Sequence, residues 1–331
     1  MSLIKRLFGS VLLFALILLA ASGYYVTRPH TPPVLPFDFS VQSGSSLKIF
    51  ANQMRQAGVI EDAQVFVLLG RSMGLSGKIK YGNYQLTQPV SMVELMEIVS
   101  KGRVVHSDLA IIEGWTFKQF REALNANPKL RHDSVSLSDA EIMQRIGAVE
   151  KHPEGLFFPD TYNFPAGSSD IALIKRAYQN MQRHLQEAWQ ARDKNLPLET
   201  PYQALILASI IEKETGKASE RTMVASVFVN RLRIGMKLQT DPTVIYGIGD
   251  KYDGNIRKRD LLQDTTYNTY TRYGLTPTPI ALPGKESINA ALHPATSSAL
   301  YFVARGDGSS QFSDSLLDHN KAVGRYQLNQ K

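Results

Sequence analysis

Two glutamates close an apolar stretch of the chain, LILASIIEKETG at residues 205–216. Spacing by three and four residues places both Glu212 and Glu214 beside apolar side chains of the same predicted helix. Burial against that surface and the negative end of the helix dipole would each raise a glutamate pKa, which a general acid needs near neutral pH. The flanking Lys213 and Lys217 oppose this, and an exposed, charged last turn is the plain alternative. The spacing does not separate the two glutamates.

The helix that carries these glutamates has a recognisable start and end. Thr200, Pro201 and Gln203 match a capping box with proline at the first helical position. Gly216 suits the C-terminal cap. The sequence therefore predicts a helix of defined limits with a carboxylate in its last turn.

Most other kinds of catalytic site lack their residues in this sequence. The chain has no cysteine, which excludes thiol catalysis, disulfides and thiolate metal sites. Its seven histidines show no H-E-x-x-H or comparable metal spacing, and no phosphate-binding P-loop occurs. We therefore expect no metal and no cofactor, and carboxylate chemistry remains.

The N-terminus carries a candidate membrane anchor. Residues 7–27 contain no charged side chain and are numerous enough to cross the hydrocarbon core of a bilayer. The basic residues of the tip, 1–6, place the N-terminus in the cytoplasm by the positive-inside rule and the body across the membrane. A cleavable signal peptide is the alternative, but the segment is long and ends in Tyr24 and Tyr25, which suit a membrane interface. The proline-rich residues 28–36 then form a semi-rigid spacer.

The chain as a whole is basic. Its formal net charge is +7 and its pI is about 9.4. Such a balance is compatible with nucleic acid, but a body outside the cytoplasm meets anionic lipid or an acidic polymer instead. We therefore expect no nucleic-acid partner.

After the spacer, predicted strands and helices alternate in an α+β pattern. Residues 37–105 read as strand, helix, helix and strand, with a further helix opened by the capping-box pattern of Ser91 and Glu94. Residues 106–200 form an intermediate α+β region, which begins with a similar strand, glycine turn and helix. Residues 201–331 contain the two glutamates and form the predicted catalytic region, a mixed α/β fold.

A segment dense in aromatic residues, EGLFFPDTY, occupies residues 154–162. Flat aromatic faces can pack against sugar rings while polar neighbours bind hydroxyl groups. A turn that packs into the core is an equally good interpretation, and the sequence leaves both open.

These segments together resemble the YceG-like endolytic murein transglycosylases. The resemblance rests on the following motifs: EGLFFPDTY at 154–162, ASIIEKETG at 208–216, ASVFVNRL at 225–232, GMKLQTDPTVIYG at 235–247, YNTY at 267–270, and AALHPA and YFVARGDG near the C-terminus. It covers most of the chain, and the motifs are long and rare in combination. The family also has one N-terminal membrane segment and a LysM-like subdomain, which agrees with the pattern of residues 7–27 and 37–105.

The resemblance implies a reaction and a set of site residues. Members cleave the glycan strand between N-acetylmuramic acid and N-acetylglucosamine without water and leave a 1,6-anhydro end. Their catalytic glutamate matches the second glutamate of E-K-E-T, which is Glu214, acting as acid and then as base. The matching positions expected to bind substrate are Gln239, Thr240, Asp241, Tyr246, Asn268 and Tyr270.

Two features limit this transfer. The family often has histidine in a G-G-H-x-F segment where this chain has Gln311, and glycine where it has Thr278.

A hydrolase would also need a second carboxylate, roughly 5–5.5 Å away for retention or 6.5–9.5 Å for inversion, and Asp241 is the candidate.

The resemblance further implies partners and a location. We expect peptidoglycan glycan strands as substrate, peptidoglycan synthases as neighbours, and a single-pass protein of the cell inner membrane with its catalytic body in the periplasm. The alternative is a non-catalytic, membrane-anchored protein that binds peptidoglycan and acts as a scaffold.

Overall fold

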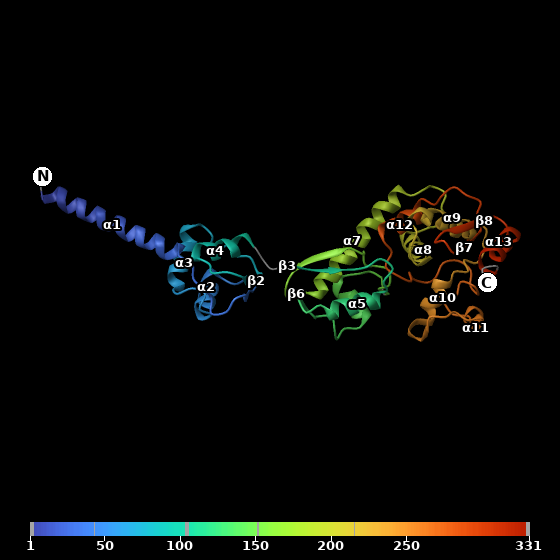
Figure 1. The fold of residues 1–331 in the computed structure, drawn as a ribbon, viewed down its shortest axis with the longest axis horizontal. Coiled ribbons are helices and arrows are strands. Elements are labelled where there is room, and N and C mark those ends of the chain that lie inside the picture. Colours follow the sequence, from blue (N-terminus) through green and yellow to red (C-terminus); the bar gives the residue numbers. More distant parts are fainter. Residues whose placement is uncertain (1–2, 43, 103–105, 151, 215, 329–331) are drawn as a thin grey trace. The chain divides into compact units, whose positions relative to one another are not determined.

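The computed structural model describes residues 3–42, 44–102, 106–150, 152–214 and 216–328. Its chain divides into two compact units (Figure 1). The first comprises Met1–Asp108 with Asn163–Ser168, and the second comprises Leu109–Tyr162 with Ser169–Lys331. Both glutamates of E-K-E-T belong to the second unit. The mixture of helices and strands agrees with the predicted α+β class, and the finer division at residue 200 stays a prediction.

The first part of the chain follows the predicted order of strand, two helices and strand. Its elements are α1 (Leu3–Thr27), β1 (Phe37–Val41), α2 (Leu47–Gln56), α3 (Ala63–Ser72), β2 (Gly82–Leu86), α4 (Met92–Lys101) and β3 (His106–Ala110). Strands β1 and β2 pair antiparallel, with Phe39 opposite Tyr84. The LysM likeness of this subdomain stays a prediction.

The core of this subdomain is aromatic. The ring of Phe39 stacks on that of Tyr84 with centroids 5.3 Å apart, and Phe50 lies 5.9 Å from Phe66. All four side chains are buried because the apolar faces of α2, α3 and α4 meet the same side of the β1–β2 pair. The predicted capping box before α4 is confirmed, since the side chain of its N-cap serine and that of the glutamate three residues later each bond the other's backbone N–H.

Helix α1 contains a stretch, Phe8–Thr27, that is long and apolar enough to cross a membrane, with a mean hydropathy of 2.0. None of that stretch is buried within the protein. By length and composition, the helix agrees with the predicted single membrane segment.

The remaining elements follow in chain order. They are α5 (Phe117–Ala126), β4 (Leu130–Arg131), α6 (Asp139–Ile146), β5 (Thr161–Pro165), β6 (Ser168–Ser169), α7 (Asp170–Ala191), α8 (Pro201–Glu214), η1 (Ala218–Glu220), α9 (Arg221–Arg233), α10 (Asp241–Ile248), η2 (Gly249–Lys251), α11 (Lys258–Leu262), α12 (Lys285–Leu292), β7 (Tyr301–Ala304), β8 (Ser310–Ser313), α13 (Leu316–Val323) and η3 (Gly324–Leu328). Strands β7 and β8 form an antiparallel pair.

Helix α8 is the central helix of the second unit. Residues 204–211 are buried on every side, because α7, α9, α10 and α12 all pack against this helix. A helix that is apolar all round belongs in a core, which explains its position. At its start Thr200 Oγ1 accepts from the N–H of Gln203, as predicted, but the Gln203 side chain accepts from Glu199 N instead of Thr200 N. The predicted cap at Gly216 depends on residue 215, which lies outside the described residues.

The EGLFFPDTY segment packs into the core of the second unit. Leu156 and Phe157 have no exposed surface, and the Phe157 ring stacks on that of Phe117 at 5.0 Å. Gly155 has φ +79°, and a Cβ there would overlap the ring of Pro279. The core-packing interpretation is therefore correct, and the aromatic side chains do not present a surface to sugars.

Candidate active site

The half-buried carboxyl of Glu214 ends helix α8, where the Thr240 hydroxyl donates a hydrogen bond to its Oε1. Burial raises the Glu214 pKa, and the negative charge of Asp241 raises it further. The Thr240 hydrogen bond and the positive charge of Arg231 oppose the rise. The balance still favours the protonated form relative to an ordinary glutamate, which is the direction that a general acid requires.

Two buried threonines, Thr243 and Thr269, hold Thr240 in place. The Thr240 N–H donates to Thr269 Oγ1 at 3.0 Å, and the Thr243 hydroxyl donates to the Thr240 carbonyl at 2.8 Å. The hydroxyls of Thr243 and Thr269 are 2.9 Å apart. Thr240 is the N-cap of α10, but its side chain makes no capping bond there because it serves Glu214. The preceding Gln239 is exposed and adopts φ +47°, which is rare for a residue with a side chain.

Asp241 and Tyr270 form a second pair in this region. The Tyr270 hydroxyl donates to Asp241 Oδ1 at 2.5 Å, and Asp241 itself is exposed in the first turn of α10. Burial and the Asp241 carboxylate raise the Tyr270 pKa, and Glu214 adds to the rise. The structure thus brings four of the predicted site residues together: Glu214, Thr240, Asp241 and Tyr270.

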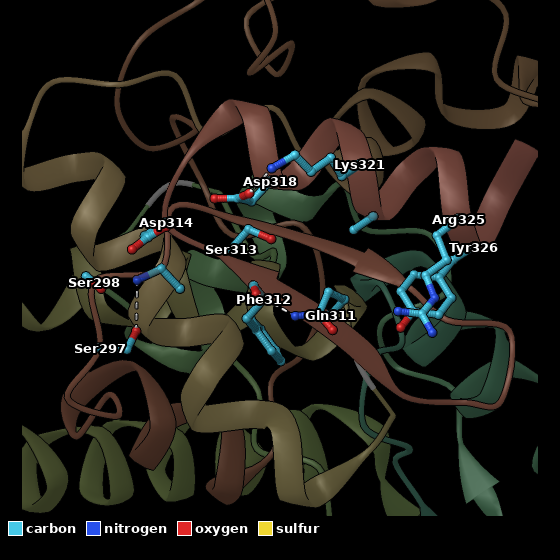
Figure 2. A pocket seen from close by; sticks show the side chains of 12 residues that line it. Ser297, Ser298, Gln311, Phe312, Ser313, Asp314, Asp318, Lys321, Arg325 and Tyr326 are labelled. Atoms are coloured by element: carbon cyan, nitrogen blue, oxygen red, sulfur yellow. Dashed lines mark hydrogen bonds and ion pairs between the residues drawn. The ribbon is translucent and has the colours of Figure 1, made fainter.

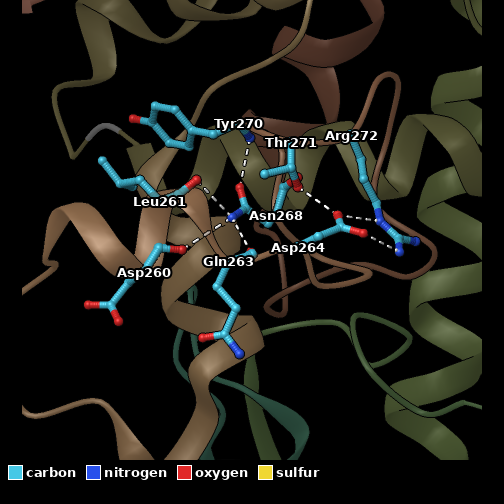
Figure 3. Close-up of polar contacts among 8 residues, drawn as sticks. All are labelled: Asp260, Leu261, Gln263, Asp264, Asn268, Tyr270, Thr271 and Arg272. Carbon is cyan, nitrogen blue, oxygen red and sulfur yellow. Dashed lines mark hydrogen bonds and ion pairs between the residues drawn. The ribbon is translucent and has the colours of Figure 1, made fainter.

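The predicted site residue Asn268 bonds to backbone groups of its own loop (Figure 3). It is buried, and its Nδ2 donates to the carbonyls of Asp260, Leu261 and Gln263 at distances of 2.7–3.2 Å. Its Oδ1 accepts from the Tyr270 N–H at 2.8 Å. The hydrogen bonds of the Asn268 side chain therefore stay within residues 260–270 and position the backbone of Tyr270.

Tyr246 contacts a different carboxylate, Glu154. Its hydroxyl donates to Glu154 Oε2 at 3.1 Å, and its ring meets that of Tyr267 edge to face at 4.9 Å. Glu154 is only 4% exposed, and burial raises its pKa to about 7 against bonds from Phe117 N, Tyr246 and Gly155 N. In the sequence the EGLFFPDTY segment stands out for its aromatic residues, and nothing marks the buried carboxyl at its first position.

A buried cation, Arg231, was also missed. Its side chain on α9 is 7% exposed, with Nε donating to the Leu300 carbonyl at 2.7 Å and Nη1 to the Leu238 carbonyl at 2.7 Å. Burial lowers the Arg231 pKa, and the charge of Glu214 opposes this. The available signal was one arginine that follows the apolar run VASVFV at helical spacing.

The structure separates the two glutamates that the spacing left equivalent. Glu212 Oε2 accepts from the N–H of Gly284, the N-cap of α12, at 2.9 Å. A carboxylate is favourable there because the first N–H groups of a helix lack internal partners. Partial desolvation and the Glu212 charge both raise the pKa of the neighbouring Glu113. Glu212 thus caps one helix, whereas Glu214 meets the Q-T-D-P segment.

The chain shows clear similarity to known proteins. The model of the YceG-like family matches residues 39–325. This chain belongs to the YceG-like family.

Individual relatives agree with this membership. The chain is 31% identical to the endolytic murein transglycosylase of Bacillus subtilis, across 87% of this chain and 84% of that protein. A Streptococcus pneumoniae protein of the same name is 27% identical across 98% of this chain, which spans 65% of the longer relative. The crystal structure of a YceG-like protein from Listeria monocytogenes has a TM-score of 0.53 at 29% identity and covers 86% of this chain and 98% of that one.

A separate cavity lies near the C-terminus of this YceG-like chain (Figure 2). Its volume is about 660 Å³, and none of the predicted site residues lines it. Its walls come from β8, α13, η3 and the loop before β7, and they include Gln311, where the family often has histidine. Among the residues that the structure describes, no group of three or more His, Asp or Glu side chains could hold a metal ion.

Proposed function

We propose that this protein is a membrane-anchored endolytic murein transglycosylase with Glu214 as its acid and base. The observation that carries the proposal is the Glu214 carboxyl, whose protonated form burial favours, bonded to the hydroxyl of Thr240 within the range that the family model matches. The relatives named endolytic murein transglycosylase support the substrate class.

The reaction uses one carboxyl group twice. Protonated Glu214 donates its proton to the glycosidic oxygen between N-acetylmuramic acid and N-acetylglucosamine as that bond breaks. The muramic C6 hydroxyl then attacks the anomeric carbon, and the carboxylate accepts its proton, which regenerates the acid. A 1,6-anhydro end results and no water is consumed.

The neighbouring groups have distinct proposed roles. The Thr240 hydroxyl orients the carboxyl, and exposed Gln239 and Asp241 bind the strand together with Tyr270. Asn268 supports Tyr270 from within its loop. Tyr246 acts from the Glu154 side and not by direct contact with Glu214.

The test is digestion of defined, uncrosslinked glycan strands by the full chain in detergent micelles. Wild type should release strands with anhydro ends, and Glu214→Gln should lower the rate by about a thousandfold, within the range for loss of a general acid–base group. Glu212→Gln is the matched control, because it lies on the same helix turn but caps α12. It should keep most of the activity, and its stability should fall.

Other outcomes identify other functions. Incorporation of oxygen-18 from solvent at the new end would show hydrolysis, with Asp241 as the second carboxylate to examine. Strand binding without cleavage by wild type would favour the scaffold alternative. Full activity in Glu214→Gln would remove the site assignment.

We also propose that α1 holds this enzyme in the inner membrane with its N-terminus cytoplasmic, next to peptidoglycan synthases. The apolar stretch Phe8–Thr27 of α1 and the basic residues that precede this stretch, Lys5 and Arg6, support this orientation. Proteolysis of intact and permeabilised spheroplasts tests it, since the body should be cleaved in intact spheroplasts. Protection of the body until permeabilisation would reverse the orientation.

A further inference from the structure

The carboxyl of Glu154 links two elements of the second unit. Its Oε1 accepts from the N–H of Phe117 at 2.9 Å, the first residue of α5, and its Oε2 accepts from the Tyr246 hydroxyl at 3.1 Å. Phe117 lies 37 residues before Glu154 in sequence and Tyr246 lies 92 residues after it. A single buried side chain therefore joins the N-terminus of α5 to α10.

Helix α10 is also the element that presents the Q-T-D-P residues. It has eight residues, with Thr240 as its N-cap, Asp241 in its first turn and Tyr246 in its second. Thr240 bonds Glu214, and Asp241 bonds Tyr270. The Glu154–Tyr246 hydrogen bond thus fixes one end of a short helix whose other end holds the catalytic carboxyl.

We propose that Glu154 and Tyr246 are positioning residues of the active site, and that ionised Glu154 holds α10 in the position that aligns Thr240 with Glu214. This inference rests on the proposed catalytic role of Glu214. Neither residue is proposed to touch the reacting atoms.

The hydrogen bonds of Glu154 determine how its ionisation affects the position of Tyr246. Both carboxyl oxygens accept, from a helix N–H and from a phenol, which is the arrangement suited to a carboxylate. The Tyr246 bond lowers the Glu154 pKa, so by reciprocity ionisation of Glu154 favours the Tyr246-bonded position. Since burial brings that pKa to about 7, the hydrogen bond weakens as pH falls below neutrality.

The surroundings contain few other groups that could cause such a response. Asp139 of α6 raises the Glu154 pKa through its charge, and His152 Nδ1 accepts from the Glu154 N–H at 3.3 Å. Tyr267 packs on Tyr246, and Tyr202 of α8 adds to the rise of the Tyr246 pKa. The pKa of Tyr246 is raised mainly by burial and then by the charge of Glu154, so its hydroxyl remains a hydrogen-bond donor throughout the neutral pH range.

The first test measures hydrogen exchange of residues 241–248 in the full chain, without substrate. At pH 8.5, Glu154→Gln and Tyr246→Phe should each speed exchange of these amides by local opening of α10, in which residue 154 stays buried, by about tenfold relative to wild type, the scale of one charge-assisted hydrogen bond. At pH 5.5 the difference between wild type and Glu154→Gln should shrink, because wild-type Glu154 is then also neutral. Equal exchange of wild type and Glu154→Gln at pH 8.5 would overturn the proposal.

The second test is the pH dependence of strand cleavage. Wild type should lose kcat as pH falls through about 7, with KM little changed, whereas Glu154→Gln and Tyr246→Phe should be slower at high pH and lack this acidic limb. An acidic limb that persists unchanged in both variants would overturn the proposal.

A matched control lies a few residues away. The Tyr178 hydroxyl donates to Glu150 Oε2 at 2.7 Å, a carboxylate–tyrosine pair that involves α7 instead of α10. Glu150→Gln should leave both the exchange of residues 241–248 and the pH profile as in wild type. If wild type cleaves nothing, the proposed function fails, but the exchange experiment still decides the role of Glu154.

Discussion

The pKa of Glu154 makes a quantitative prediction for folding stability. Its value in the folded protein, about 7, lies above the ordinary 4.5, so folding favours the protonated carboxyl. The stabilisation is fully present below about pH 4.5 and is lost as pH rises through about 7. A shift of this size corresponds to about 3 kcal/mol, and the full conversion is justified because the side chain is only 4% exposed.

Glu154→Gln isolates this contribution, since glutamine imitates the neutral acid at every pH. The free energy of unfolding of wild type, minus that of the variant, should fall by about 3 kcal/mol between pH 4.5 and pH 8.5. Urea titrations of the full chain in micelles can follow the second unit alone, because both tryptophans, Trp115 and Trp189, belong to it. The difference between the two proteins removes the contributions of all other titrating groups.

A difference that stays constant with pH would refute this reasoning. It would mean that the Glu154 carboxyl has similar proton affinity in the folded and unfolded chains, so burial would not control it. Glu150→Gln provides the control, because its carboxyl also bonds a tyrosine hydroxyl but is half-buried.

Three further predictions concern the residues around Glu214. Thr240→Ala removes a hydrogen bond that lowers the Glu214 pKa, so the alkaline limb of the pH profile of kcat/KM should move to higher pH. Thr240→Ser keeps the hydroxyl and should leave this limb in place. An alkaline limb that does not move in the alanine variant would contradict the role of the hydroxyl. Arg231→Met leaves the buried Leu238 carbonyl without its hydrogen-bond donor and should lower the free energy of unfolding in urea by about 3 kcal/mol. An unchanged midpoint of the urea transition would contradict this structural role of Arg231. Gln239→Gly relieves a positive φ and should raise the free energy of unfolding by about 1 kcal/mol, measured by urea unfolding. The same variant should bind glycan strands more weakly, measured by co-sedimentation with peptidoglycan. A loss of stability would show that the backbone at residue 239 is not strained.

Local features of this fold could be predicted because their causes lie close together in the sequence. The cap of α4 depends on Ser91 and Glu94, which are three residues apart. The burial of α8 follows from its apolar residues alone. The end points of β2, Gly82–Leu86, could not be predicted in this way, since they depend on pairing with β1.

The site could be predicted only where residues are neighbours in sequence or match the family motifs. Spacing placed Glu212 and Glu214 on one helix, but their different roles depend on Gly284 and Thr240, which are 72 and 26 residues away. The first turn of α10 is held by threonine contacts with Thr269, which lies 29 residues after Thr240. Long-range hydrogen bonds of this kind leave no periodic pattern in a sequence.

Three ionisable side chains from three different elements hold the segment between residues 237 and 246. Arg231 of α9 bonds the Leu238 carbonyl, Glu214 of α8 bonds the Thr240 hydroxyl, and Glu154 of the loop before β5 bonds the Tyr246 hydroxyl. A charge removed from water is costly unless hydrogen bonds replace its hydration, so each of these groups depends on the segment for its partners. The segment in turn depends on them, because a short helix such as α10 is marginal without tertiary contacts. The charges that tune the proton affinity of the site are therefore also the contacts that fix its geometry, which is why the two properties should change together when any one of the three is neutralised.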